Sequence, residues 1–199
     1  MLFKEAQGLA KNGLMLREGR IVDATIISAP SSTKNESGQH DPDMYQTQKG
    51  NQWYFGIKMH IGVDDTLGPN DSIDTTAANV HEIVPVNKLL HDDKLRVFGD
   101  AGYPGHPETG WDKHRNDVSW FIAKRPDTRE MLDANKLNAE KIKARIRAKV
   151  EQPFRYFKQV FGYRKMRYQG LLKNTAQLFT LFGLANLELA RRVKRSQCA

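Results

Sequence analysis

The order of segments along the chain predicts an α/β protein. Three segments with the composition of β-strands come first and predict an antiparallel three-strand meander. Shorter apolar strands then alternate with helical patterns, and the chain ends in helical patterns. A meander followed by alternating helices and strands is typical of an α/β arrangement.

The meander occupies the first part of the chain. Its strands are predicted at residues 20–27, 52–63 and 72–76, and a turn at residues 64–68 joins the last two. Residues 28–51 are rich in Ser, Asn, Gln, Gly and Asp, so we expect an exposed loop between the first two strands.

Two further strands are predicted after the meander. They are compact and apolar, at residues 95–99 and 119–123, with a Gly- and Pro-rich loop after the first. A short helix is expected before them at residues 83–91, with Asn79 and Glu82 as candidates for capping its start.

Both ends of the chain carry helical patterns. Residues 2–16 predict a short amphipathic helix. From about residue 138 the pattern turns helical again, and Pro153 should kink that helix because it lacks an N–H group and clashes with the preceding turn. We expect the helical pattern to break at Gly162 and at Gly170. A last amphipathic helix is expected at residues 175–193.

The positive charge is concentrated in one segment. The chain has 199 residues, 39% hydrophobic and 27% charged, with a net charge of +8. Residues 136–168 contain eleven Lys or Arg and two acids, so the positive net charge of this segment exceeds that of the whole chain. Such a block favours a polyanionic partner such as nucleic acid, although a solvated helix face has a similar composition.

The cysteine content and the hydropathy pattern exclude several classes of protein. The single cysteine, Cys198, forms neither an intrachain disulfide nor a zinc cluster, which fits a reducing cytoplasm. We find no pattern of a signal peptide, and the most apolar segment, residues 176–190, is too short and too polar to cross a bilayer. We therefore expect a cytoplasmic protein without a membrane partner.

Three acids occupy positions that disfavour acids. Asp23 lies inside a predicted strand, Asp100 ends an apolar strand, and Glu151 is the lone acid of a basic helical stretch. Acids placed against local preference indicate a functional site. Carboxylates are the ligands that Mg²⁺ prefers, and a pair of such ions supports phosphoryl transfer on DNA.

Each acid also has an ordinary structural interpretation. Asp23 could be a buried, hydrogen-bonded strand acid, and Asp100 could begin a turn. Glu151 could pair with Arg147 or Arg155 on its own helix. No acid is specific alone, and the hypothesis depends on their order and surroundings together.

The surroundings of the acids are specific as a set. The three segments are GRIVDATI at residues 19–26, FGDAGY at residues 98–103 and VEQPFR at residues 150–155. They resemble the acidic blocks of bacterial insertion-sequence DDE transposases, most closely those of the family numbered five. The resemblance covers nearly the whole chain, because residues 58–60, 76–81 and 161–174 also resemble sequence segments of that family.

This resemblance implies a ribonuclease-H-like fold, in which the meander joins parallel strands in a mixed sheet flanked by helices, with a C-terminal helix. It implies that Asp23, Asp100 and Glu151 are catalytic and hold two Mg²⁺ ions, which Mn²⁺ can replace. Water would first cut the DNA, and the freed 3′-hydroxyl would then attack target DNA. The implied partners are insertion-sequence ends, target DNA and further copies of the chain in a homo-oligomer.

The resemblance also implies a division of the chain. Residues 1–19 would be the remnant of an N-terminal helical region, residues 20–170 the catalytic domain and residues 171–199 a C-terminal helix packed on it. Related transposases usually have a longer region before the first acid, which would recognise terminal repeats. We therefore expect most of that region to be missing here.

Related transposases carry a signature of Tyr, two residues, Arg, three residues, Glu, six residues and Lys. Arg147, Glu151 and Lys158 match its spacing, whereas Ala144 stands at the Tyr position. The three matching residues share one helix face because they lie four and seven residues apart. The cations would bind DNA phosphates beside the metal-binding acid. Further DNA contacts are expected from Lys143, Lys149, Arg155, Arg164 and Lys165.

Other polar residues receive a structural interpretation. We expect Asp41 and Asp43 to be turn residues. Lys58 and His60 alternate onto one strand face, where exposed polar positions are the safer prediction and a position directed at the active site is the alternative.

Two other functions stay open. A plain metal-dependent nuclease of the same fold would cut DNA without joining it. An inactive DNA-binding or inhibitory fragment would bind DNA without cutting it.

Overall fold

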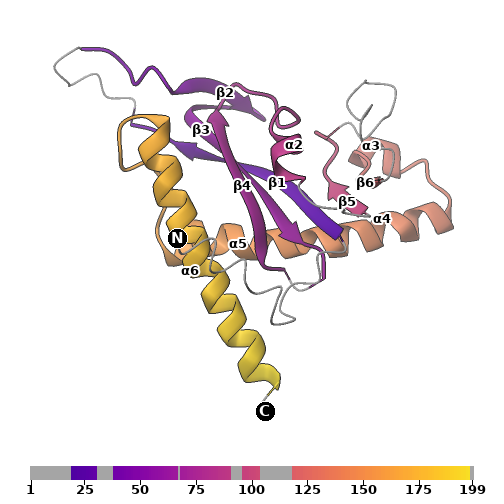
Figure 1. Ribbon diagram of the computed structural model, residues 1–199. Helices are drawn as coiled ribbons and strands as arrows, with labels where there is room; N and C mark the ends of the chain where they lie inside the picture. Colours follow the sequence, from indigo (N-terminus) through magenta and orange to yellow (C-terminus); the bar gives the residue numbers. More distant parts are fainter. Residues whose placement is uncertain (1–18, 31–37, 67, 91–95, 104–117, 198–199) are drawn as a thin grey trace.

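The chain folds around a mixed β-sheet. The computed structural model describes residues 19–30, 38–66, 68–90, 96–103 and 118–197. The sheet has six strands in the order β2-β3-β1-β5-β6, with β4 paired to β3 outside this path. Helices flank the sheet, and a long C-terminal helix extends beyond it (Figure 1). The predicted fold class is confirmed, and the helix expected at residues 2–16 lies outside the described residues.

The antiparallel part of the sheet is the predicted meander. β1 (Gly19–Ser28) and β4 (Asn70–Ala77) both pair with the long strand β3 (Gln52–Asp64). The exposed loop predicted at residues 28–51 is wrong near its end, where β2 (Tyr45–Lys49) pairs with the first residues of β3. β2 is largely exposed and polar, so no alternation of apolar residues marks it as a strand.

The parallel part of the sheet brings two of the predicted site residues to one level. β5 (Arg96–Gly99) runs parallel to both β1 and β6 (Ser119–Ile122). Its register pairs Phe98 with Ile21. Asp100 and Asp23 each follow this pair by two residues, on adjacent strands.

β1 contributes to an apolar core on both faces of the sheet because successive side chains on a strand point in opposite directions. Ile21 joins a cluster that includes Ile61, Phe154 and Phe182. Val22 joins a second cluster with five residues: Val86, Leu89, Leu90, Val97 and Tyr103. Burial on both faces leaves little water around the middle of β1, where Asp23 lies.

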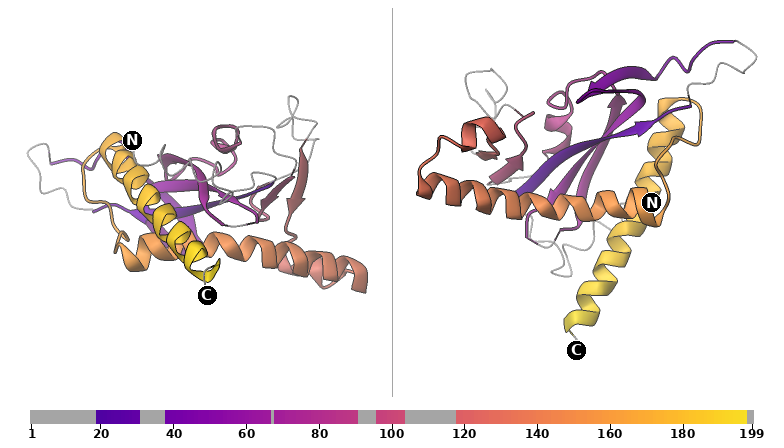
Figure 2. Two further views of the ribbon diagram at one scale, coloured as in Figure 1. Left: turned by 60° about the horizontal axis from the view of Figure 1, so that its bottom comes forward. Right: turned by 180° about the vertical axis from the view of Figure 1, so that it is seen from behind.

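A long helical run lies across one face of the sheet (Figure 2). It comprises α4 (Ala134–Arg147), the 3₁₀ turn η3 (Ala148–Val150), α5 (Glu151–Arg155) and the π-helical turn η4 (Tyr156–Val160). The interruption predicted for Pro153 is confirmed, since irregular turns stand on both sides of α5. Proline has no N–H group for the α-helical ladder, which explains the change of helix type.

The last helix, α6 (Leu171–Gln197), follows both predicted breaks. Gly162 and Gly170 have positive φ values of 63° and 82°, a conformation that glycine adopts without strain. Asp41 and Asp43 do more than form a turn. Their carboxylates accept hydrogen bonds from the N–H groups of Gly170 and Leu171, at 2.6 and 2.8 Å, and so cap the start of α6.

Two short helices complete the described chain, α2 (Val86–Leu89) and α3 (Pro126–Arg129). α2 is shorter than predicted, and no side chain caps it. The expectation that Asn79 or Glu82 caps this helix is therefore wrong. Turn residues separate both from Val86, the first residue of the helix.

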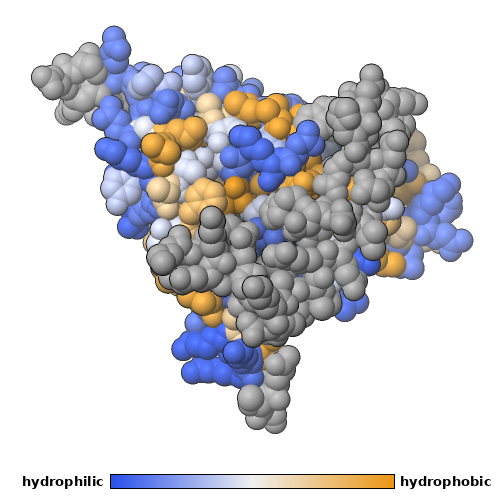
Figure 3. Space-filling model, in the orientation of Figure 1, coloured by the Kyte–Doolittle hydropathy of each residue, from blue (hydrophilic) through white to orange (hydrophobic). Residues whose placement is uncertain are grey.

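The surface of α6 changes character along its length. Its middle packs on the core through Leu178 and Phe182, whereas Arg191, Arg192 and Lys194 near its end are exposed. This end of the molecule is hydrophilic in the space-filling view (Figure 3). Within the described ranges, no helix is both long and apolar enough to cross a membrane.

A pair of buried amides anchors α6 to the sheet, and we predict that it contributes strongly to stability. Asn186 exchanges hydrogen bonds of 2.7–3.0 Å with the backbone and side chain of Asn70, and both residues are fully buried. Replacing Asn186 with Ala should lower the free energy of unfolding by about 2–3 kcal/mol, because buried polar groups of Asn70 lose their partners. Urea denaturation measures this loss. The exposed Thr180→Ala change on the same helix is the control, and an equal effect of both would contradict the prediction.

His60 should make the stability depend on pH. The expectation of an exposed position is wrong, since His60 is fully buried, with Nε2 2.8 Å from Thr76 Oγ1. Burial lowers its pKa to about 3, and the charges of Lys58 and Lys88 add to this effect. The unfolded chain therefore binds a proton that the folded state excludes. The resulting stability is fully present above about pH 6.5 and is lost as the pH falls, by up to about 1.4 kcal/mol per pH unit.

Urea denaturation at several pH values from 7 to 4 measures this contribution. His60→Gln keeps a partner for Thr76 but cannot take up a proton, so we expect its stability to fall less steeply with acidification than that of the unmodified chain. Two parallel pH profiles would show that His60 is not the group responsible.

Candidate active site

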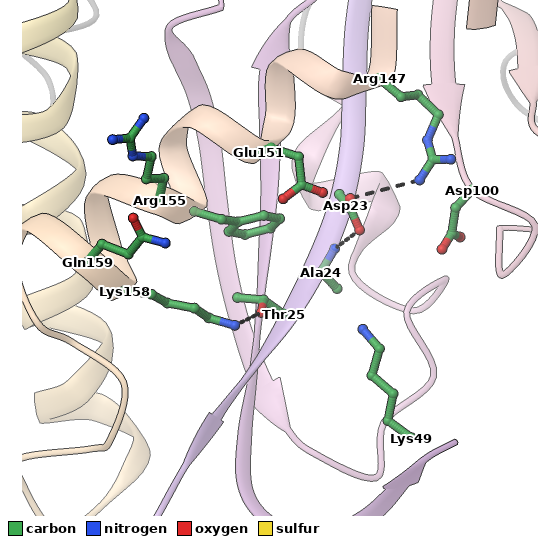
Figure 4. A pocket seen from close by; sticks show the side chains of 11 residues that line it. Asp23, Ala24, Thr25, Lys49, Asp100, Arg147, Glu151, Arg155, Lys158 and Gln159 are labelled. Carbon is green, nitrogen blue, oxygen red and sulfur yellow. Dashed lines mark hydrogen bonds and ion pairs between the residues drawn. The ribbon is translucent and has the colours of Figure 1, made fainter. Parts of the chain in front are cut away.

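The three predicted acids line one cavity, although they come from distant parts of the chain. Asp23 lies in the middle of β1, Asp100 directly follows β5, and Glu151 is the first residue of α5. The cavity has a volume of about 460 Å³. In the close view, Glu151 points from its helix towards Asp23, and Asp100 lies on the other side of Asp23 (Figure 4). We call this space the Glu151 cavity.

Asp23 is a carboxylate in an unfavourable environment. Its side chain is 16% exposed, and it accepts a hydrogen bond of 2.7 Å from the N–H of Ala24. Burial raises its pKa to about 6, and the negative charge of Asp100 raises it further, whereas the Ala24 N–H and Arg147 act in the opposite direction. A cation between the two acids would relieve both the desolvation and the repulsion.

Asp100 both begins a turn and lines the cavity. Its Oδ1 accepts a hydrogen bond of 2.8 Å from the N–H of Gly102, so it does begin a turn. Its Oδ2 has no hydrogen-bond partner among the described residues. The turn therefore orients this carboxylate and leaves one oxygen for a ligand.

Glu151 is exposed on the cavity wall. The salt-bridge interpretation finds no support, because no ion pair joins Glu151 to Arg147 or Arg155 in the described part of the chain. Arg147 is instead directed at Asp23, with 3.9 Å between Nη2 and Oδ2.

The donor set fits a divalent ion in its chemistry. Asp23 and Asp100 supply oxygen ligands, and Mg²⁺ is commonly held by one or two carboxylates together with water. Across the described ranges, however, no group of three or more His, Cys, Asp or Glu residues lies at ligating spacing. The fit is thus to the Asp23–Asp100 pair, and Glu151 faces this pair across the cavity without completing a ligating group.

Three of the predicted DNA-binding cations line the same cavity: Arg147, Arg155 and Lys158. The Nε of Arg147 is buried without a partner among the described residues. Lys158 donates a hydrogen bond of 2.5 Å to Thr25 Oγ1 on β1. Burial lowers the pKa of Lys158, and the positive charge of Lys49 lowers it further. A phosphate group in the cavity would pair with these cations and relieve their mutual repulsion.

The other predicted cations make contacts within the protein. Lys143 pairs with Glu140 at 2.7 Å, and Lys149 donates to the backbone oxygens of Asp65 and Thr66 beside the β3–β4 turn. Arg164 Nε donates to the backbone oxygen of Lys158 at 2.9 Å, and Lys165 forms a single β-bridge with Ser28. None of these four lines the Glu151 cavity.

Lys49 and Gln159 also line the cavity, and the sequence analysis missed both. Lys49 ends β2 and reaches the cavity because the β2–β3 hairpin folds towards β1 (Figure 4). It lay in a predicted loop, and no local pattern indicated its position. Gln159 follows Lys158 in the π-helical turn η4, and its residue type does not by itself indicate a site.

The family assignment agrees with this geometry. The family model described as the transposase DDE domain matches residues 15–187. The chain belongs to this family. The match spans Asp23, Asp100 and Glu151, and it makes the mixed sheet with its flanking helices a ribonuclease-H-like fold. No solved structure matches the chain. Membership supports a transposase-type function, and the family is metal-dependent and implies a DNA substrate.

Some of these cations line the cavity and others bond to the protein itself, so replacing them with Ala should have different effects. Arg155 is exposed on the cavity wall, so Arg155→Ala should weaken binding to non-specific duplex DNA and reduce the slope of log affinity against log salt by about 1. Lys149→Ala should leave that slope unchanged and lower the free energy of unfolding by about 1 kcal/mol, because two backbone oxygens lose their donor.

Fluorescence anisotropy over a range of salt concentrations measures the slopes, and urea denaturation measures the stabilities. The assignment of Arg155 to DNA binding fails if its slope equals that of the unmodified protein. The structural assignment of Lys149 fails if its replacement lowers the slope as much as that of Arg155.

Proposed function

We propose that this domain is the catalytic core of an insertion-sequence transposase of the family numbered five, which cleaves DNA and transfers the cleaved strand. Asp23, Asp100 and Glu151 are its catalytic acids and hold its metal ions. The observation that carries the proposal is the Glu151 cavity, where three acids from a strand, a loop and a helix face the same space as Arg147 and Lys158.

Divalent ions, Mg²⁺ or Mn²⁺, would polarise the scissile phosphate and activate the attacking oxygen at this site. The residues of the chain bind and orient the DNA. Arg147 has an unpaired Nε, and Lys158 extends from η4 to β1, so both are suited to hold phosphate oxygens beside Asp23.

The proposed reaction has two steps at the same site. Water first attacks the phosphorus, and the bond to the 3′ oxygen breaks. The freed 3′-hydroxyl then attacks a phosphorus of target DNA. The bond from that phosphorus to the target's own 3′ oxygen breaks, this oxygen leaves as a hydroxyl, and the element strand is joined to the target. Since two element ends have to meet on one target, we also propose that the chain acts as a homo-oligomer on DNA. We further propose a cytoplasmic location, where bacterial DNA lies.

Two other functions remain as alternatives. An inactive DNA-binding or inhibitory fragment would bind DNA without cutting it. A plain metal-dependent nuclease is distinguished by its products, because it would leave hydrolysed ends and no joined strands.

We predict that Asp100→Asn lowers both cleavage and strand transfer by about 1000-fold or more, because the site loses an anionic metal ligand. An assay that separates hydrolysed ends from joined products measures the two steps. The unfolding temperature should not fall, because the change removes a negative charge that repels Asp23. Glu130→Gln, at the exposed end of α3, is the matched control.

Each outcome decides between the candidates. Unchanged cleavage by Asp100→Asn would refute the proposed site. Cleavage without joining by the unmodified protein would support the nuclease, and DNA binding without cleavage would support the inactive fragment.

A further inference from the structure

A second cavity adjoins the Glu151 cavity and shares Asp23, Asp100 and Lys49 with it. It has a volume of about 300 Å³, and Glu82, Lys58 and Gly102 are among the residues that line it. We call it the Glu82 cavity. Glu82 lies in the turn between β4 and α2, where the sequence analysis expected only a helix cap. The two shared acids therefore have Glu151 on one side and Glu82 on the other.

Glu82 and Asp100 each have a carboxylate oxygen close to Gly102. A Cβ atom added to Gly102 would lie 3.0 Å from Asp100 Oδ1 and 3.5 Å from Glu82 Oε2. The two oxygens are therefore no further apart than the sum of these distances. Repulsion by Asp100 adds to burial in raising the pKa of Glu82. Two acids so placed are stabilised by a cation that both can reach.

The other contacts of Glu82 are weak. Its Oε1 lies 3.9 Å from the Nζ of Lys58, which instead donates a hydrogen bond of 2.9 Å to the backbone oxygen of Val80. Glu82 has no hydrogen bond among the described residues. No strong contact among the described residues therefore holds this carboxylate in place, and it can rotate towards Asp100 when a bound cation offsets the repulsion between the two acids.

Tyr103 is an independent sign of a ligand at this place. Its side chain is 1% exposed, and its hydroxyl has no hydrogen-bond partner among the described residues. Its backbone N–H donates a hydrogen bond of 3.1 Å to the backbone oxygen of Asp100, so Tyr103 belongs to the same turn as that acid. Burial raises the pKa of its hydroxyl, and the negative charges of Glu82, Asp23 and Asp100 raise it further. A buried hydroxyl without a partner costs about 1–3 kcal/mol. A carboxylate turned towards it, or water carried by a bound cation, would remove that cost.

The two cavities differ in their balance of charge. The Glu151 cavity is lined by three acids and four cations, the latter being Lys49, Arg147, Arg155 and Lys158. The Glu82 cavity is lined by three acids but only two cations, Lys49 and Lys58. The first balance suits the phosphates of DNA, and the second suits a cation.

We propose that Glu82 is a fourth carboxylate of the active site, which binds a divalent cation together with Asp23 and Asp100, and that the buried hydroxyl of Tyr103 positions one of these ligands. This inference rests on the proposed function. The three carboxylates do not lie at ligating spacing in this structure, so binding requires the rotation of Glu82 described above. Glu151 then acts in the other cavity, which would hold the DNA phosphates.

The test measures Mn²⁺ binding rather than activity. Isothermal titration calorimetry and Mn²⁺ paramagnetic resonance on the full chain give the stoichiometry and the dissociation constant. We expect Glu82→Gln to weaken binding by about tenfold or more and Glu82→Asp to restore part of it. Tyr103→Phe keeps the ring and removes the hydroxyl, so it should weaken binding by about tenfold. In the absence of Mn²⁺ its unfolding temperature should not fall, because the change removes a buried polar group without a partner among the described residues.

Glu130→Gln is the control, and Asp100→Asn separates this inference from the proposed function. If Glu82→Gln binds Mn²⁺ like the control while Asp100→Asn does not, the role of Glu82 is refuted and the proposed function stands. If Asp100→Asn also binds normally, or if the unmodified chain binds no Mn²⁺ at millimolar concentration, the cation site is refuted. A loss of unfolding temperature in Glu82→Gln without a change in Mn²⁺ affinity would leave Glu82 with only its structural pairing to Lys58.

Discussion

Val150, Phe154 and Phe157 press the long helical run against the sheet, and the charged residues of the Glu151 cavity depend on this apolar contact. The contact determines the rotation of the helix about its axis. The side of the run that packs into the core leaves Arg147, Glu151 and Lys158 facing the middle of β1. Pro153 is itself buried, and the irregular turns around it adapt the helix to the sheet without turning these three residues away.

The same packing makes it unfavourable to keep charged carboxylates at Asp23 and Asp100. Asp23 lies on a strand that is buried on both faces, and the parallel register brings it level with Asp100. The fold thus keeps two like charges close together in a largely buried region, where Arg147 and backbone N–H groups offset them in part. Stability alone would favour apolar residues at these positions, which supports the catalytic role proposed for both acids. His60, by contrast, is buried in a form that carries no charge, and its environment serves stability.

Charged residues on the basic helical run differ in what they do, although their local sequence is similar. Lys143 and Lys149 lie within the same run as Arg147, Arg155 and Lys158. The first two bind groups of the protein, whereas the other three line the cavity. A basic composition predicts a polyanionic partner for the whole segment, but it does not distinguish the residues that contact the partner from those that hold the helix to the sheet. What distinguishes Lys143 and Lys149 is a hydrogen bond to the backbone oxygen of Ile122 and of Thr66, respectively, which lie some twenty and some eighty residues away along the chain.

The amino-acid sequence by itself determined the strands of the meander, the break at Pro153 and the order of the three acids, because these depend on neighbours a few residues apart. The surroundings of Asp23, Asp100 and Glu151 also carried enough family text to indicate a transposase. Only the tertiary structure decided that β2 brings Lys49 to the cavity and that Glu82 lies near Asp100 instead of capping a helix. It also decided that the hydroxyl of Tyr103 is buried without a partner among the described residues. The physical reason is that cavity walls form between residues distant in sequence. Their positions follow from strand register and helix packing, which no local pattern contains.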